Sequence, residues 1–217
     1  MTFCRDVRPG EPGLAGRDYL AVWEDVLHRS GLPVAETAAG RLRFTLAAPL
    51  PLLASSEAEL AELWLTSRLP AWRLREAVTP LLPGGHRITS LEDVWMGAPA
   101  LAGRVAAADY RVTLAPDPDA QSLSAAVRRV LDAKTLPRER QKGSAFRSYD
   151  LRPLLLDVQI ADAGPPVILR FRGRIHPELG SGRPEEILAA IGDEVGVDLD
   201  AVETVRERLV LIDDLEA

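Results

Sequence analysis

The residues with the most chemical content form a basic stretch in the second half of the chain. Between positions 128 and 152, eight basic residues accompany three acidic ones, a net charge of +5 within a chain of net charge −6. The basic residues are Arg128, Arg129, Lys134, Arg138, Arg140, Lys142, Arg147 and Arg152. Phe146 and Tyr149 are interleaved with them, as base-stacking residues often are in proteins that bind single-stranded RNA. We interpret this stretch as a candidate nucleic-acid-binding site; the alternative is a solvated hairpin whose arginines pair with nearby carboxylates.

A second basic row comes from Arg170, Arg172 and Arg174. They alternate with apolar residues, and alternate side chains of a strand point to opposite faces of a sheet. We expect the three arginines to project from the exposed face of a central strand. Together with the predicted hairpin at residues 138–147 they should form one cationic surface.

The remaining chemically active side chains do not form a recognisable site. Three histidines lie in different predicted elements, and none has a second ligand at a metal-binding spacing. The single cysteine, Cys4, excludes an internal disulfide and a zinc cage built of cysteines. The three-cysteine cluster that would hold an iron–sulfur cluster is missing as well. We therefore assign no catalytic residue, no metal and no cofactor.

Composition indicates a globular, cytoplasmic protein. Hydrophobic residues make up 47% of the 217 residues and charged residues 27%, enough for two small cores of roughly 100 residues each. A pI near 5.2 argues against nonspecific attraction of the whole molecule to nucleic acid and leaves a local basic face possible. The use of one cysteine agrees with a reducing cytosol. We find neither a run of about 18 apolar residues nor a signal-peptide pattern, so we expect no membrane segment.

The order of periodic segments divides the chain into two similar halves, residues 1–103 and 104–217. In the first half we expect strands and helices in the order strand, helix, strand, strand, helix, strand. These segments are residues 1–7, 17–30, 41–46, 59–66, 71–82 and 86–94. Residues 59–66 also fit a helix opened by a capping box of Ser56 and Glu59, whereas alternating apolar positions suit a strand. With the strand, the order predicts a ferredoxin-like unit, in which helices pack on one face of an antiparallel sheet.

The second half repeats this order around an additional hairpin. A strand through Tyr110 precedes a helix capped by Asp119 or Ser122, and Pro184 opens the second helix. The remaining expected segments are the polar hairpin at 138–149 and strands at 155–160, 167–175 and 205–211. The predicted fold class is therefore α+β, with two tandem ferredoxin-like units and antiparallel sheets.

Several short motifs carry a resemblance to a known family. They are Gly31-Leu-Pro-Val-Ala35, Ala48-Pro-Leu-Pro51, Ala98-Pro-Ala-Leu101, Ala108-Asp-Tyr-Arg-Val112, Asp150-Leu-Arg-Pro153 and Arg183-Pro-Glu-Glu186. Together they resemble the bacterial radical SAM-linked family, a domain of unknown function found beside or fused to B12-binding-type radical SAM proteins. The resemblance covers most of the chain and implies an extended segment at residues 59–66, which favours the strand there.

The chain departs from that family at two motifs. The family's Ser-His-x-Asp motif corresponds here to Ala15-Gly-Arg-Asp18, so that only Asp18 remains. Its Gly-Phe-Asn-Pro-His-Pro loop corresponds to the shorter Glu36-Thr-Ala-Ala-Gly40, which has no histidine. Roles of the family's histidines are therefore not carried over to this divergent member.

Three functions from different classes fit these observations. We favour a noncatalytic accessory protein that binds RNA, or an RNA-modifying partner, through the basic second half. The first alternative is an enzyme acting on a small anionic or RNA substrate, with Asp18 and the arginines as its site; it requires a carboxylate of perturbed pKa facing cationic groups. The second is an interaction scaffold for a radical SAM protein, which requires an exposed apolar patch.

Overall fold

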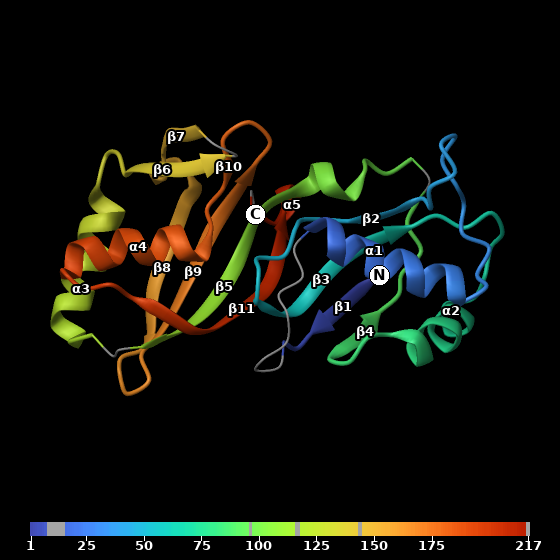
Figure 1. Cartoon of the computed structure of the whole chain (residues 1–217), viewed down its shortest axis with the longest axis horizontal. Coiled ribbons are helices and arrows are strands. Elements are labelled where there is room, and N and C mark those ends of the chain that lie inside the picture. Colours follow the sequence, from blue (N-terminus) through green and yellow to red (C-terminus); the bar gives the residue numbers. More distant parts are fainter. Residues whose placement is uncertain (8–15, 96, 116–117, 143–144, 216–217) are drawn as a thin grey trace. The chain divides into compact units, whose positions relative to one another are not determined.

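The computed structural model describes the chain apart from residues 8–15, 96, 116–117, 143–144 and 216–217 (Figure 1). It divides into two compact units, Met1–Val105 and Ala106–Ala217. Both units combine helices with sheets whose described pairings are antiparallel. In the described part of the chain, no helix is long and apolar enough to cross a lipid bilayer.

The first unit has a sheet in the order β4-β1-β3, with β2 paired to β3. Its strands are β1 (Thr2–Arg5), β2 (Phe44–Leu46), β3 (Ser55–Leu63) and β4 (His86–Ser90). Its helices are α1 (Gly16–Arg29), α2 (Ala71–Val78) and the short 3-10 segments Thr79–Leu81 and Leu101–Arg104. The segment with two interpretations is thus extended, and the prediction of a strand there is confirmed.

Helix α1 forms the core of the first unit together with the sheet. Tyr19, Trp23 and Leu27 recur every four residues, so that one face of the helix is apolar, and all three are buried. The Trp23 ring lies against Phe3 of β1, with 4.6 Å between ring centroids. The chain leaves the helix through Gly31, whose φ of +64° is left-handed and costs glycine little.

The second unit has a sheet in the order β8-β9-β5-β11, and β10 pairs with the end of β9. Its strands are β5 (Val105–Ala115), β8 (Leu155–Asp162), β9 (Ile168–His176), β10 (Gly180–Ser181) and β11 (Asp200–Leu211). Its helices are α3 (Ala120–Asp132), α4 (Pro184–Val195), α5 (Ile212–Leu215) and a 3-10 turn at Arg152–Leu154. Asp119 caps α3, because its carboxylate accepts a hydrogen bond from the Ser122 amide.

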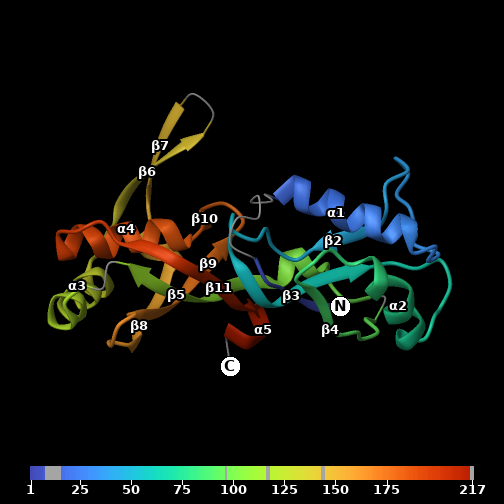
Figure 2. The same cartoon turned by 60° about the horizontal axis from the view of Figure 1, so that its bottom comes forward.

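One face of this sheet is covered by α4 (Figures 1 and 2). Within this unit, no described element covers the other face, which we call the open face. Ile187, Leu188 and Ile191 of α4 are buried, as are Leu169 and Phe171 of β9. The hairpin formed by β6 (Pro137–Lys142) and β7 (Ala145–Asp150) is a separate two-stranded sheet inserted between α3 and β8. In Figure 2 this hairpin stands away from the main sheet.

Candidate nucleic-acid interface

The open face of the second unit is built from the polar positions of alternating strands. In the β5–β9 ladder, Asp109 lies opposite Arg172 and Arg111 lies opposite Arg170. The intervening residues Tyr110 and Phe171 are buried on the covered face, where their rings stack with 5.3 Å between the ring centroids. Because paired residues of an antiparallel ladder share a face, the charged side chains gather on the open side.

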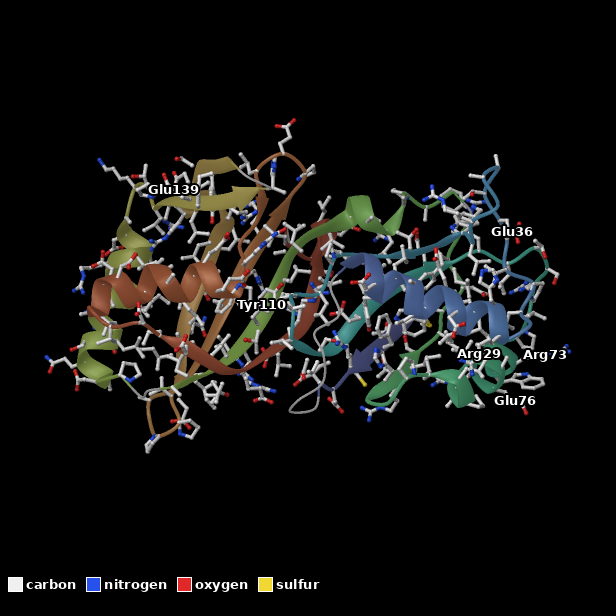
Figure 3. The ribbon with its side chains drawn as sticks, in the orientation of Figure 1. Arg29, Glu36, Arg73, Glu76, Tyr110 and Glu139 are labelled. Atoms are coloured by element: carbon white, nitrogen blue, oxygen red, sulfur yellow. The ribbon has the colours of Figure 1, made fainter. Side chains whose placement is uncertain are left out.

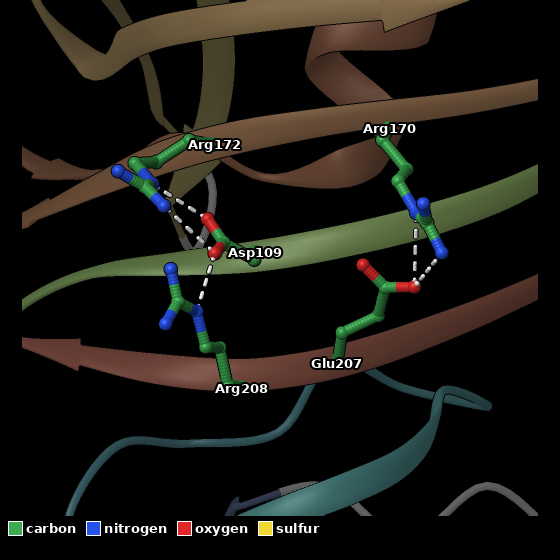
Figure 4. Close-up of polar contacts among 5 residues, drawn as sticks. All are labelled: Asp109, Arg170, Arg172, Glu207 and Arg208. Carbon is green, nitrogen blue, oxygen red and sulfur yellow. Dashed lines mark hydrogen bonds and ion pairs between the residues drawn. The ribbon is translucent and has the colours of Figure 1, made fainter. Parts of the chain in front are cut away.

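Asp109 is the centre of a three-residue cluster on this face (Figure 4). Arg172 donates hydrogen bonds from Nε to Oδ1 at 2.6 Å and from Nη2 to Oδ2 at 2.9 Å, which is a bidentate pair. Arg208 of β11 donates from Nε to Oδ2 at 2.8 Å. Burial alone raises the pKa of Asp109, but the hydrogen bonds from the two arginines outweigh it and hold the pKa below its usual value. The Asp109 carboxylate is therefore ionised at neutral pH.

Glu207 of β11 holds a second pair of arginines. Arg170 donates to its Oε1 from Nε at 3.1 Å and also lies 2.9 Å away through Nη2 (Figure 4). Arg111 donates to the same oxygen from Nη1 at 3.3 Å. Each carboxylate is thus shared between two guanidinium groups.

Arginines outnumber carboxylates on the open face. Among the described residues that the strand ladders and ion pairs place on this face, five arginines accompany three carboxylates, those of Asp109, Asp157 and Glu207. The arginines are Arg111, Arg170, Arg172, Arg174 and Arg208. The Arg170 and Arg208 side chains are 53% and 57% exposed, so that solvent reaches both. The face therefore keeps a positive charge after its internal ion pairs are counted.

The hairpin arginines lie on the other side of the sheet. Arg140 donates two hydrogen bonds to Glu186 of α4, at 2.7 and 2.8 Å, and Arg138 pairs with Asp193 of the same helix. Helix α4 covers the face opposite to that of Arg172. The expectation of one cationic surface was therefore wrong: strand alternation does not reveal on which side of the sheet an inserted hairpin docks.

Tyr149 belongs to the anchor of the hairpin. The Arg140 guanidinium lies over its ring, 4.9 Å from the centroid. Burial, followed by the nearby Glu186 carboxylate, raises the pKa of Tyr149 to about 12. Phe146, in contrast, is 70% exposed near the tip, and Glu139 is exposed on β6 (Figure 3). The side chains of the predicted residues Lys142 and Arg147 lie outside the described residues.

Arg152 has a structural role, because its side chain donates hydrogen bonds to backbone carbonyls. Its guanidinium donates to the carbonyls of Leu131 and Ala133 at the end of α3, at 2.8 and 3.1 Å, and to Leu155 at 2.7 Å. A cation that satisfies the last carbonyls of a helix also complements the helix dipole. We therefore leave Arg152 out of the interface.

Asp18 is exposed in the first turn of α1, in the first unit. It borders a shallow depression of about 630 Å³ that is also lined by Asp25, Arg29, Leu81 and Pro83. Asp25 neutralises Arg29, with 3.1 Å between Oδ2 and Nη1. Among the described residues that line this depression, no cluster of cations faces the Asp18 carboxylate, and the enzyme hypothesis required such a cluster.

Comparison with known proteins gives a family and a fold neighbour. The model of a family described as "Uncharacterized protein conserved in bacteria (DUF2344)" matches residues 14–184. A search of curated proteins found no match. Among solved structures, a chain in the crystal structure of a Cbf5-Nop10-Gar1 complex is similar, with a TM-score of 0.53 and 11% sequence identity. The match covers 96% of the present chain and 48% of that chain, so this protein spans about half its length. At this identity the likeness concerns the mixed α and β fold alone.

Proposed function

The chain belongs to the DUF2344 family of bacterial proteins, and from that premise we propose that it is a noncatalytic accessory protein that binds single-stranded RNA. The binding surface is the open face of the second unit. The observation that carries the proposal is the excess of arginines there, because phosphate contacts supply most of the affinity for nucleic acid.

The proposed architecture behind this face is a ferredoxin-like unit in each half. The strand orders support it. When the four sheet strands of each half are numbered along the chain, both sheets have the order 4-1-3-2, which is β4-β1-β3-β2 in the first half and β11-β5-β9-β8 in the second. An antiparallel sheet with helices on one face leaves the other face available, and RNA-recognition sheets use such a face. This face presents guanidinium groups rather than aromatic rings, so its contacts are with phosphates and with bases stacked on guanidinium planes.

The existing ion pairs are compatible with RNA binding. Arg170 and Arg208 keep more than half of their side-chain surface exposed, and Arg208 uses only Nε toward Asp109. Their remaining nitrogen atoms can therefore donate to phosphate oxygens while the carboxylates hold the guanidinium planes in place. Such positioning lowers the conformational entropy lost on binding.

Titration of a labelled single-stranded RNA, followed by fluorescence anisotropy at several NaCl concentrations, tests the proposal. The variant is Arg170→Ala/Arg208→Ala, which leaves Arg172 on Asp109 and Arg111 on Glu207. The matched control is Arg73→Ala/Arg87→Ala, which removes the same charge from exposed positions on α2 and β4.

Each lost phosphate contact should reduce the slope of log affinity against log salt by roughly 0.7, hence by about 1.4 for the interface variant. The control should keep the wild-type slope. Absence of wild-type binding at low salt ends the RNA proposal. Equal slopes for the two double variants place the contacts elsewhere, with the Phe146 end of the hairpin as the next surface to test.

The partner that we propose for this protein is a radical SAM protein. The support is the resemblance of its motifs, Asp150-Leu-Arg-Pro153 and Arg183-Pro-Glu-Glu186 among them, to the radical SAM-linked family. Affinity purification from the native cell, with and without nuclease, distinguishes the arrangements. A radical SAM protein that is retained after nuclease treatment supports direct association. A radical SAM protein that is lost together with the RNA supports association through RNA. If no radical SAM protein is recovered under either condition, this part of the proposal is removed.

An enzyme acting on an anionic substrate is the second candidate, and Asp109 favours it. Its carboxylate has a lowered pKa and faces two guanidinium groups, which is the arrangement that Asp18 lacks. In that mechanism the arginines would bind the anion and Asp109 would act as an ionised carboxylate. If Asp109→Asn abolishes turnover of a bound RNA while leaving the affinity for that RNA within about twofold of wild type, the enzyme hypothesis replaces the proposal of a noncatalytic protein.

A further inference from the structure

Three strands and one helix of the first unit bring four polar side chains together on the covered face of its sheet. Arg5 of β1 lies opposite Ser56 of β3 on one side and His86 of β4 on the other. Tyr19 of α1 lies above them, with its ring centroid 4.9 Å from the Arg5 guanidinium carbon. Its hydroxyl is 2.9 Å from Nε2 of His86.

Two members of this row are buried donors without an acceptor. Arg5 is 2% exposed and Ser56 is 1% exposed. Within the described part of the chain, neither Arg5 Nη1 nor Ser56 Oγ has a hydrogen-bond partner. Among the described side chains, the Tyr19 ring contacts the Arg5 guanidinium through a cation–π interaction. This contact gives the guanidinium N–H groups no hydrogen-bond acceptor.

A buried guanidinium is costly unless an anion and acceptors accompany it. Natural cores avoid this cost by using an apolar residue, as Phe3 does two positions earlier on the same strand. Here the chain instead aligns an arginine with a serine hydroxyl across the ladder. Both groups donate, so that the missing complement is an acceptor with several oxygens.

We propose that Arg5 and Ser56 bind a phosphate group, with Tyr19 and His86 forming one wall of the site. Guanidinium groups donate from a planar fork that matches phosphate oxygens, and a serine hydroxyl supplies a further donor. The shared chemistry covers inorganic phosphate and the 5′-phosphate of a nucleotide. The site lies in the first unit and uses none of the arginines proposed to contact RNA.

Thermal unfolding of the full chain tests this site. The probes are inorganic phosphate, adenosine 5′-monophosphate and adenosine, each at constant ionic strength set with NaCl. A ligand that binds the folded state raises the Tm progressively as its concentration exceeds Kd. We expect phosphate and the nucleotide to raise it and adenosine to have no effect. A larger effect of the nucleotide than of phosphate at equal concentration identifies a nucleotide site; an equal effect identifies a phosphate site.

Arg5→Met removes the charge at similar volume, and Arg87→Met, an exposed neighbour on β4, is the matched control. The phosphate-dependent rise should be lost in Arg5→Met and kept in Arg87→Met. Ser56→Ala, which leaves the guanidinium in place, should weaken phosphate binding by about tenfold or more in calorimetry, since it removes a hydrogen bond to a charged group.

Three outcomes overturn the proposal: no rise for wild type beyond that of NaCl, an equal rise in Arg5→Met, or unchanged affinity in Ser56→Ala. The Ser56→Ala measurement decides the case if Arg5→Met does not fold. The Arg170→Ala/Arg208→Ala protein should keep the phosphate effect, so that failure of this site and failure of RNA binding are distinguishable.

Discussion

Replacing Asp109 with asparagine removes the charge that two guanidinium groups share and keeps the size of the side chain. Arg172 holds both carboxylate oxygens and is 31% exposed, so this bidentate pair contributes on the order of 1–2 kcal/mol. Arg208 is 57% exposed, and screening reduces its share to about 0–0.5 kcal/mol. We expect Asp109→Asn to lower the free energy of unfolding at pH 7 by about 1–2 kcal/mol and the Tm by about 2–8 °C.

This loss of stability has a defined pH dependence. Despite the opposing effect of burial, hydrogen bonds from Arg172 and Arg208 keep the folded-state pKa of Asp109 below the usual 3.8. A carboxyl whose pKa is lower in the folded state contributes its full stability above the unfolded-state pKa of about 3.9. The contribution disappears as pH falls through the folded-state pKa. The difference between wild type and Asp109→Asn should therefore be constant above about pH 5 and shrink in stronger acid.

Urea unfolding followed by circular dichroism measures the difference, with tryptophan fluorescence as an internal reference. All four tryptophans lie in the first unit, so their fluorescence reports on that unit directly. The control is Asp200→Asn, which removes an exposed carboxylate from β11. An unchanged midpoint for Asp109→Asn at pH 7 refutes the reasoning. So does a gap from wild type that widens as the pH falls toward 3.

Three further outcomes follow from the second unit. Arg152→Met should cost about 2–4 kcal/mol in urea unfolding, because three backbone carbonyls lose a charged donor, whereas Arg128→Met should stay within about 0.5 kcal/mol. In an ultraviolet pH titration, Tyr149 should ionise near pH 12. The stability that its buried neutral form provides should be present below pH 10 and lost as the pH rises through 12. Titration of every tyrosine at the usual pH would contradict this prediction. Phe146→Ala should leave the unfolding midpoint unchanged, since its ring is 70% exposed, and a clear loss of stability would mean that the ring is packed.

Much of the second-unit sheet could be predicted from local periodicity. Apolar and charged residues alternate in β5 and β9, so the facing directions of Tyr110, Phe171 and Arg172 follow from the period of a strand. Segment 59–66 could not be assigned by periodicity alone, because its apolar positions fit both periods. Its pairing with two neighbouring strands, which is a long-range property, makes it extended.

The partners of the arginines were not predictable in the same way. Glu207 and Arg208 are consecutive on β11, yet both reach charged groups on the open face, and strict alternation would separate them. The Arg138 and Arg140 partners lie 55 and 46 residues further along the chain, on a helix whose docking position no local pattern specifies. Arg5 gave no signal either, because a lone arginine in a short strand usually faces solvent.

The hairpin and the α4 carboxylates that anchor it are far apart along the sequence, and this separation has a consequence during synthesis. Hairpins form within about 1–10 μs, but an isolated two-stranded hairpin is marginally stable in water. Glu186 follows Arg140 by 46 residues, which a ribosome adds in about 2–10 s. Through that interval the nascent hairpin opens and closes many times without its carboxylate partners. Arrival of α4 therefore completes the hairpin, and its cationic strands become ordered late in the folding of the nascent chain.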